Sequence, residues 1–198
     1  MSNIELHASP LSPPSQAVHV VLDLLGLDYK YVEVTMSTEY LSMSPVLTYD
    51  NLVITESRVA MTYLVSKHMT SMLTYPNQGL YFKIGTFYQM MGDCVYPVCS
   101  GKTDTVPEEK KEALKRALKM ANQMTSSRYL LGSYMTIADV DFLSTYSTLE
   151  ACDFISLEEY KYLSVWAERM KLEIPKYYTN CGKGAAALGE LFNSNYYI

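Results

Sequence analysis

The chain has 198 residues, of which 48% are hydrophobic and 19% charged, and its formal net charge is −5. This composition belongs to a folded globular protein and excludes a disordered one. The acidic balance argues against a surface built to neutralise nucleic-acid phosphates. The length is enough for one full core, or for two small domains packed together.

Strand and helix patterns alternate from the N-terminus, whose first residues lack the basic and apolar regions of a secretory signal. Ile4–His7 alternates apolar and polar residues, as a strand does. Pro13 and Pro14 suit the first turn of a helix, and Gly26 suits the left-handed residue that ends it. Tyr29–Val34 predicts a second strand.

A hairpin and a second helix follow. The pair Asp50-Asn51 stands between two apolar runs, which is a signal for a two-residue hairpin turn. Ser57–Lys67 has the apolar spacing of a helix. Residues 1–68 therefore read as β-α-β, then a hairpin, then α, which predicts an α/β domain.

Residues 69–78 read as a linker, and strand signals almost vanish after them. The rest of the chain, 79–198, shows helical periodicity alone and predicts an all-helical domain of about five helices. Pro107 suits an early helical position. Thr136 and Asp139 have the spacing of a helix-capping arrangement.

The helix that begins near Leu80 predicts a second subunit. It carries more apolar residues than one buried stripe needs, including Phe82 and Phe87. Covering this extra surface would require another copy of the chain, so we expect a homodimer.

The four cysteines show no paired spacing, which favours free packing thiols in a reduced, cytoplasmic compartment over disulfides or metal ligands. The three histidines also lack the spacing of a metal site, so we expect no metal. No apolar run is long enough to cross a bilayer, and we expect neither membrane nor nucleic acid as a partner.

Ser12 lies in the turn before the first predicted helix. There its hydroxyl and the positive end of the helix would stabilise an anionic sulfur or oxygen. The plain alternative is that Ser12 is only a turn or capping residue. Ser9 and Ser15 are close competitors for the same role.

Two further segments, Ser44-Pro45 and Glu56–Arg58, suit an extended ligand. A cis bond at Pro45 would turn the preceding backbone outward to pair with such a ligand, whereas the common trans isomer would make an ordinary turn. Glu56 suits an ammonium group and the N–H groups at Ser57 suit a carboxylate, as in the α-amino acid end of a ligand. Plain helix capping is the alternative.

In combination these segments resemble insect glutathione transferases of the delta and epsilon classes, with the delta class favoured. The matching runs in chain order are Leu6–Val18, Ser44–Leu47, Ile54–Val65, Leu80–Gln89, Asp93–Pro97 and Met135–Asp139. They cover nearly the whole chain. The resemblance implies a thioredoxin-like N-terminal domain, a helical C-terminal domain, a cytoplasmic homodimer, and glutathione as co-substrate without a metal.

The resemblance also implies roles for single residues. Ser12 would donate its hydroxyl to the glutathione sulfur, and the backbone of Ser44, beside Pro45, would pair with the cysteinyl part. The γ-glutamyl group would be held by Glu56, Ser57 and Arg58. The pocket for the electrophile would be lined by Tyr88, Met91, Gly92 and Tyr96. Of these, Tyr88, Gly92 and Tyr96 lie one turn apart on a single helix face, although spacing alone would read the tyrosines as core packing.

These roles imply a detoxifying enzyme that stabilises the glutathione thiolate and conjugates it to hydrophobic electrophiles. The alternative is a binding protein of the same family, weak or inactive in catalysis, that carries an apolar ligand. Two departures bear on this choice. Gln16 stands where these classes usually carry Arg, and the segment Glu33–Ser44 is shorter than theirs.

In the family, that segment supplies a second helix and a histidine that helps to bind the glycine end of glutathione. Its shortening predicts weaker glutathione binding and reduced activity. Lys30 and His7 are the first candidates for a replacement contact.

Overall fold

The computed structural model describes residues 3–34, 44–68 and 83–197. Its N-terminal part is a four-stranded sheet with strand order β2-β1-β3-β4. Strand β1 pairs in parallel with β2 and antiparallel with β3, and β4 pairs antiparallel with β3. The elements are β1 (Ile4–Ala8), α1 (Pro13–Leu24), β2 (Lys30–Glu33), β3 (Val46–Tyr49), β4 (Leu52–Ile54) and α2 (Ser57–His68).

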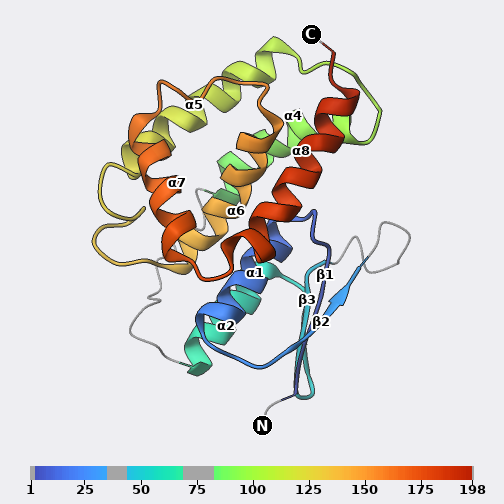
Figure 1. The fold of residues 1–198 in the computed structure, drawn as a ribbon, viewed down its shortest axis with the longest axis vertical. Coiled ribbons are helices and arrows are strands. Elements are labelled where there is room, and N and C mark those ends of the chain that lie inside the picture. Colours follow the sequence, from blue (N-terminus) through green and yellow to red (C-terminus); the bar gives the residue numbers. More distant parts are fainter. Residues whose placement is uncertain (1–2, 35–43, 69–82, 198) are drawn as a thin grey trace.

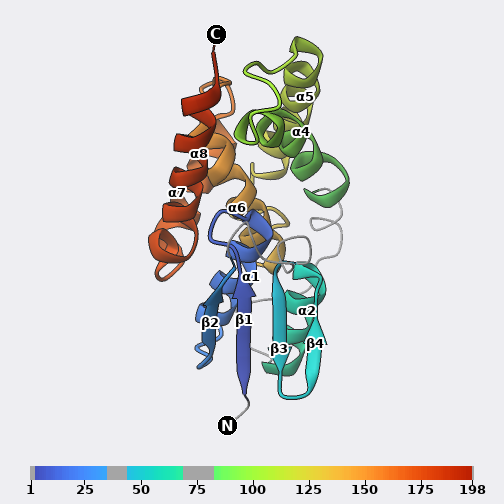
Figure 2. The same ribbon diagram turned by 90° about the vertical axis from the view of Figure 1, so that its right-hand side faces the viewer.

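The sheet buries one face, against α1 and α2, which lie on the same side of it (Figures 1 and 2). Along β1, Ile4, Leu6 and Ala8 are buried and alternate with the partly exposed Glu5 and His7. This is the period-two pattern of a sheet with one face on the core. The strand predicted at Ile4–His7 is therefore confirmed, and it extends to Ala8.

The turns follow the local chemistry of the sequence. Gly26 has φ +63°, the left-handed conformation that ends a helix without a side-chain clash. The hairpin between β3 and β4 turns at Asp50, whose φ is 52°, and Asp tolerates this region better than most residues. The predicted helix end and the predicted hairpin are both confirmed.

The C-terminal part of the described chain is helical, as predicted. It begins with a π-helical turn, η2 (Lys83–Tyr88), that runs into α4. The other elements are α4 (Gln89–Cys99), α5 (Glu108–Met124), α6 (Ile137–Cys152), α7 (Lys161–Glu173), the π-helical turn η3 (Tyr178–Gly182) and α8 (Lys183–Asn195). Helix α6 is buried on nearly all sides and packs against α1, α4, α7 and α8. It joins the two parts of the fold (Figure 1).

A capping box at the start of α6 organises the helical part. Asp139 accepts hydrogen bonds from the Thr136 backbone N–H at 2.9 Å and the Thr136 hydroxyl at 2.7 Å. It also accepts from the Leu130 N–H at 2.8 Å and the Trp166 indole at 3.1 Å. The predicted cap is therefore also a buried polar centre between α6, α7 and the preceding loop. Pro107, predicted as an early helical residue, is the N-cap of α5 instead.

The fold is thus a thioredoxin-like N-terminal domain followed by a helical C-terminal domain. The predicted linker, 69–78, and Phe82 lie outside the described residues. Phe87 does not support the argument for a second subunit, because it is fully buried and packs on Phe142 with 4.5 Å between ring centroids. None of the described helices is long and apolar enough to cross a membrane.

Candidate functional site

The strand directions bring the predicted site segments to one edge of the sheet. Strands β1, β2 and β4 run the same way and β3 runs against them. The residues that follow β1 and β4, and those that precede β3, therefore share one edge. That edge carries Ser12, the Ser44–Pro45 bond and Glu56–Arg58, and it faces the helical domain (Figure 2).

Ser12 is the N-cap of α1 and is partly exposed. Its backbone N–H donates to the Ser9 carbonyl at 3.1 Å and its own carbonyl accepts from the Gln16 N–H at 2.9 Å. Its hydroxyl makes no capping bond, and it has no hydrogen-bond partner among the described residues. Because Pro13 and Pro14 lack N–H groups, this hydroxyl is a prominent donor at the start of α1.

Ser9 and Ser15, the competitors of Ser12, are buried and form hydrogen bonds within the fold. Ser9 is 6% exposed and Ser15 is 1% exposed. The Ser9 backbone N–H donates to the Ser44 hydroxyl at 3.2 Å, and the Ser15 and Ser44 hydroxyls are 3.0 Å apart. These bonds join the loop before α1 to the turn before β3. Of the two isomers considered above, the Ser44–Pro45 peptide is cis.

The third segment begins helix α2. The Ala60 N–H donates to the Glu56 carbonyl at 2.8 Å, so Glu56 occupies the cap position before Ser57, the first residue of α2. Ser57 is buried at 3% exposure, while Glu56 is exposed. The first N–H groups of α2 lie at this helix start, where they suit a carboxylate.

The guanidinium of Arg58 is anchored by the helical domain. Its Nε donates to Oδ2 of Asp141 in α6 at 3.2 Å, and the Asp141 side chain is fully buried. The Nη2 atom of Arg58 is also buried and has no hydrogen-bond partner in the part of the chain that the structure describes. Sequence reasoning missed Asp141, because no local pattern connects α2 with a residue of α6.

The predicted electrophile residues lie on and beside α4. The hydroxyls of Tyr88 and Tyr96 are 3.1 Å apart, and their rings meet edge to face at 6.4 Å. A Cβ on Gly92 would lie 3.0 Å from Cε2 of Tyr96, so glycine makes room for this ring. Met91 differs from its prediction, because it is completely buried in the core and packs α4 rather than lining a cavity.

Tyr96 shares a cavity of about 320 Å³ with Ser12. The other walls of this cavity are Ser9, Leu11, Cys99, Ser100, Leu188 and Leu191. Its α8 residues were not predicted, because nothing local distinguishes Leu188 and Leu191 from ordinary helix packing. Burial raises the pKa of the Cys99 thiol to about 11, so this wall thiol stays protonated at neutral pH.

Gln16 holds the loop before α1. Its amide N donates to the Pro10 carbonyl at 2.8 Å, and the Cys181 thiol donates to its amide oxygen at 3.3 Å. Lys30 and His7 are the two residues suggested above for a contact with the glycine end of glutathione. Lys30 and His7 both lie against Glu5, at 3.2 and 3.3 Å, on the sheet face away from α1 and α2.

All four cysteines are free thiols, in agreement with the predicted absence of disulfides. Within the described ranges, no three His, Cys, Asp or Glu side chains are grouped so as to hold a metal ion.

These features define a two-domain protein of the glutathione-binding type. They are a thioredoxin-like sheet, a serine at the start of its first helix, and a helical domain over the same edge. The family models confirm this. The N-terminal domain of glutathione S-transferase matches residues 6–71, and the C-terminal domain matches residues 56–171. The chain therefore belongs to the glutathione S-transferase family.

Solved structures agree along the whole chain. A delta-class glutathione transferase of Nilaparvata lugens is 28% identical with a TM-score of 0.87, and the match covers 96% of this chain and 99% of that one. An epsilon-class enzyme of the housefly, Musca domestica, is 25% identical with a TM-score of 0.88, over 99% and 100% of the chains. A homolog from Drosophila mojavensis with bound glutathione is 26% identical with a TM-score of 0.82, over 100% and 99%.

Proposed function

We propose that this protein conjugates the thiolate of glutathione to hydrophobic electrophiles, with Ser12 as the catalytic residue. The observation that carries the proposal is the Ser12 hydroxyl, which lies at the start of α1, has no partner among the described residues and borders the cavity beside Tyr96. A donor in this position suits an anion next to an apolar chamber.

The proposed chemistry is activation of a thiol. A free thiol has a pKa of about 8.5 and is mostly protonated at neutral pH, whereas the thiolate is the nucleophile. The Ser12 hydroxyl and the positive end of α1 would stabilise the anion and lower that pKa. The thiol proton leaves to water. The sulfur then forms a bond to an electrophilic carbon, which either expels a leaving group or takes up a proton after addition.

The rest of glutathione would extend along the sheet edge. We propose that the Ser44 backbone, beside Pro45, pairs with the cysteinyl part. Glu56 would bind the ammonium group of the γ-glutamyl end, and the N–H groups of Ser57 and Arg58 would bind its carboxylate. The Arg58 guanidinium, fixed by Asp141, would add positive charge there.

The electrophile would lie against Tyr88, Gly92 and Tyr96. Burial raises the pKa of the Tyr88 hydroxyl and also that of Tyr96, so both remain protonated donors at neutral pH. They offer aromatic surface together with a polar handle to an apolar substrate. Met91 drops out of this pocket because it is buried.

We also propose that the protein is a cytoplasmic homodimer of the delta class and that it acts in detoxification. The exposed apolar side chains of Leu52, Val53 and Val59 on β4 and α2 support a partner subunit in place of the argument from Phe87. The segment shortened relative to the family lies largely outside the described residues, so its effect on activity stays a prediction.

The test is Ser12→Ala with glutathione and a chlorodinitrobenzene as electrophile. Loss of one preorganised donor commonly costs about 2.7–4 kcal/mol in the transition state, and a solvated thiolate loses less. We expect a fall in kcat/KM of up to about a hundredfold. The pH–rate profile should also shift to higher pH, because the pKa of the thiol rises. Ser100→Ala is the matched control, because the Ser100 hydroxyl lines the same cavity but donates to the Pro97 carbonyl.

An unchanged profile in Ser12→Ala would contradict the assignment. The alternative function, an inactive binding protein that carries an apolar ligand, is separated by two measurements. Retention on immobilised glutathione together with turnover supports the enzyme. Binding of an apolar dye without turnover supports the carrier.

A further inference from the structure

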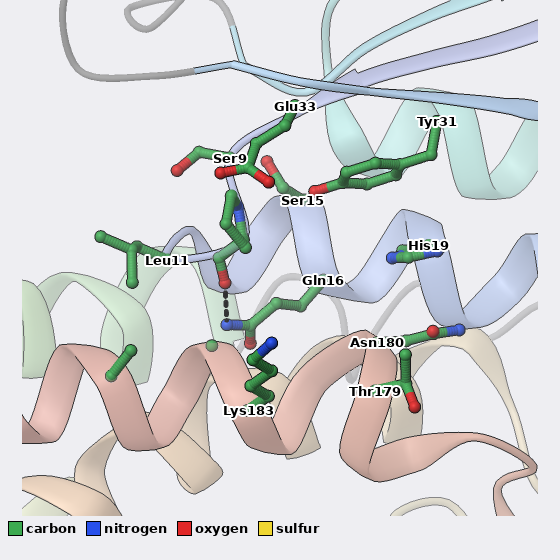
Figure 3. Close-up of a pocket in the computed structure, with 13 residues that line it drawn as sticks. Ser9, Leu11, Ser15, Gln16, His19, Tyr31, Glu33, Thr179, Asn180 and Lys183 are labelled. Atoms are coloured by element: carbon green, nitrogen blue, oxygen red, sulfur yellow. Dashed lines mark hydrogen bonds between the residues drawn. The ribbon is translucent and has the colours of Figure 1, made fainter.

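A second cavity, of about 400 Å³, borders the loop before α1 (Figure 3). Strand β2 and helix α1 form one side of it, and η3 and α8 form the other. It shares only Ser9 and Leu11 with the cavity that contains Ser12 and Tyr96. No residue assigned above to glutathione or to the electrophile lines it, so it is separate from the proposed active site.

One wall of this second cavity is aromatic. The rings of His19 and Tyr31 are stacked with centroids 4.6 Å apart, and Tyr29 meets His19 edge-on at 5.6 Å. The Tyr31 hydroxyl donates to the Ala8 carbonyl at 3.1 Å, which fixes the orientation of the ring. Burial lowers the pKa of His19, although Asp23 beside it acts in the other direction, so the His19 imidazole is uncharged at neutral pH.

The opposite wall carries one cation. Lys183, the first residue of α8, is exposed, and its side chain extends toward Gln16 at the floor of the cavity (Figure 3). Nearby lysines are neutralised, Lys176 by Asp23 at 3.2 Å and Lys30 by Glu5. Lys183 has neither an ion pair nor a hydrogen bond with any described residue. The one acid of the lining, Glu33, lies across the cavity on the strand side (Figure 3).

The cavity is preformed. Gly184 lets α8 approach the loop before α1 so closely that a Cβ there would clash with the Pro10 carbonyl. Gln16 donates to that same carbonyl at 2.8 Å. At the far end, the Asn180 amide donates to Asp23 at 2.8 Å and joins η3 to α1. A site held from both domains binds a ligand without a large ordering cost.

We propose that this cavity is a second binding site, for a planar aromatic carboxylate whose ring packs against the His19–Tyr31 wall and whose carboxylate pairs with Lys183. The ion pair between the ligand carboxylate and Lys183 would neutralise the one unpaired charge of the helical wall. The cavity is large enough for a two-ring ligand. Binding there would require neither glutathione nor turnover, so the proposal stands or falls independently of the proposed function.

The test uses naphthalene-2-carboxylate as the probe and titration calorimetry on the full chain. We expect binding that persists when S-hexylglutathione saturates the active site. Naphthalene-2-carboxamide, which has the same shape without the charge, should bind about tenfold more weakly or worse, because a hydrogen bond between charged groups is lost. Lys183→Gln should weaken binding of the carboxylate to a similar extent and leave binding of the carboxamide unchanged.

A steric pair of variants locates the site. Ala187→Trp fills the cavity from α8 and should abolish binding, whereas Ala186→Trp, on the neighbouring exposed position of the same helix, should leave it unchanged. Circular dichroism checks that both variants fold, and Lys183→Gln tests the site without a bulky side chain. Displacement of the probe by S-hexylglutathione, or equal binding by wild type, Lys183→Gln and Ala187→Trp, would overturn the proposal.

Discussion

Arg58 and Asp141 form an ion pair across the two domains, with 3.2 Å between Arg58 Nε and Asp141 Oδ2. The Arg58 side chain is 18% exposed and that of Asp141 is fully buried. The pair fixes the start of α2, where glutathione is proposed to bind, against the middle of the helical domain. A contact between domains and the proposed contact with glutathione would therefore involve the same side chain.

Removing one partner of this pair should destabilise the fold strongly. Asp141→Ala leaves a buried guanidinium without its counter-charge, which typically costs about 3–5 kcal/mol. Urea unfolding should show a lower free energy of unfolding by that amount. Glu190→Ala, which removes an exposed carboxylate from α8, should change it by no more than about 0.5 kcal/mol.

Replacing both partners separates stability from binding. Because apolar residues of similar volume often substitute for a buried pair at little cost, Arg58→Met combined with Asp141→Leu should recover most of the stability lost in Asp141→Ala. If Arg58 also binds the γ-glutamyl carboxylate, this double variant should keep a raised KM for glutathione. A normal KM in a stable double variant would limit Arg58 to a structural role.

Gly92→Ala should alter the electrophile pocket selectively. The new Cβ would lie 3.0 Å from Cε2 of Tyr96, so the ring must move. We expect a changed KM for the electrophile and an unchanged KM for glutathione. Gly85→Ala is the control, because nothing lies within 4 Å of a Cβ there and it shares the gain of about 1 kcal/mol in helix propensity. Equal kinetics in both variants would remove Gly92 from the pocket.

His19 should make the protein less stable at mildly acidic pH. Burial lowers its pKa below the ordinary value of 6.5. As the pH falls below 6.5, the unfolded chain takes up a proton that the folded chain refuses. The free energy of unfolding is therefore unaffected by His19 protonation above pH 6.5 and declines below it. The decline is at most about 1.4 kcal/mol per pH unit and is smaller for a partly exposed ring.

Urea midpoints of wild type and His19→Gln between pH 7.5 and 5 measure this effect. The variant should lose less stability than wild type over that range. Asp23, which accepts from Asn180 and Tyr29 and pairs with Lys176, has a lowered pKa. Its stabilisation is lost only as the pH falls through and below the ordinary value of 3.8, outside the measured range. Parallel pH curves for wild type and variant would contradict the prediction.

Glutathione should bind little better than γ-glutamylcysteine, which lacks the glycine. The family resemblance implies a histidine that residues 33–44 do not contain, and Lys30 and His7 are both engaged with Glu5 on the outer sheet face. A hydrogen bond to a charged group is worth about 1.5–3 kcal/mol. Calorimetry should therefore give nearly equal dissociation constants, where a held glycine carboxylate would separate them by about tenfold or more.

Lys30→Gln should also leave both constants unchanged. A strong preference for glutathione that Lys30→Gln abolishes would show that this lysine moves to the ligand and that the prediction is wrong.

The secondary-structure elements and their order could be predicted from the amino-acid sequence. Alternation along Ile4–Ala8, the prolines before α1, Gly26 and the Asp50 turn act through local sterics and hydrogen bonding, so their signals are local too. The same is true of the capping box at Thr136 and Asp139, and of Tyr88, Gly92 and Tyr96 on one helix face. Ser12 and the cis bond at Pro45 could be singled out only through the family resemblance. Taken alone, a serine there is more often a turn or capping residue, and a proline is more often trans.

Which of these residues meet could be found only from the folded chain. Long-range pairs such as Arg58 with Asp141, Gln16 with Cys181 and Asn180 with Asp23 join segments far apart in the chain, and no periodicity encodes them. The same reason explains the two misread residues. Met91 and Phe87 have the composition of a pocket or an interface, but the packing of α4 and η2 against α6 turns both into the core. Burial depends on what lies opposite a side chain, and that is a property of the folded chain alone.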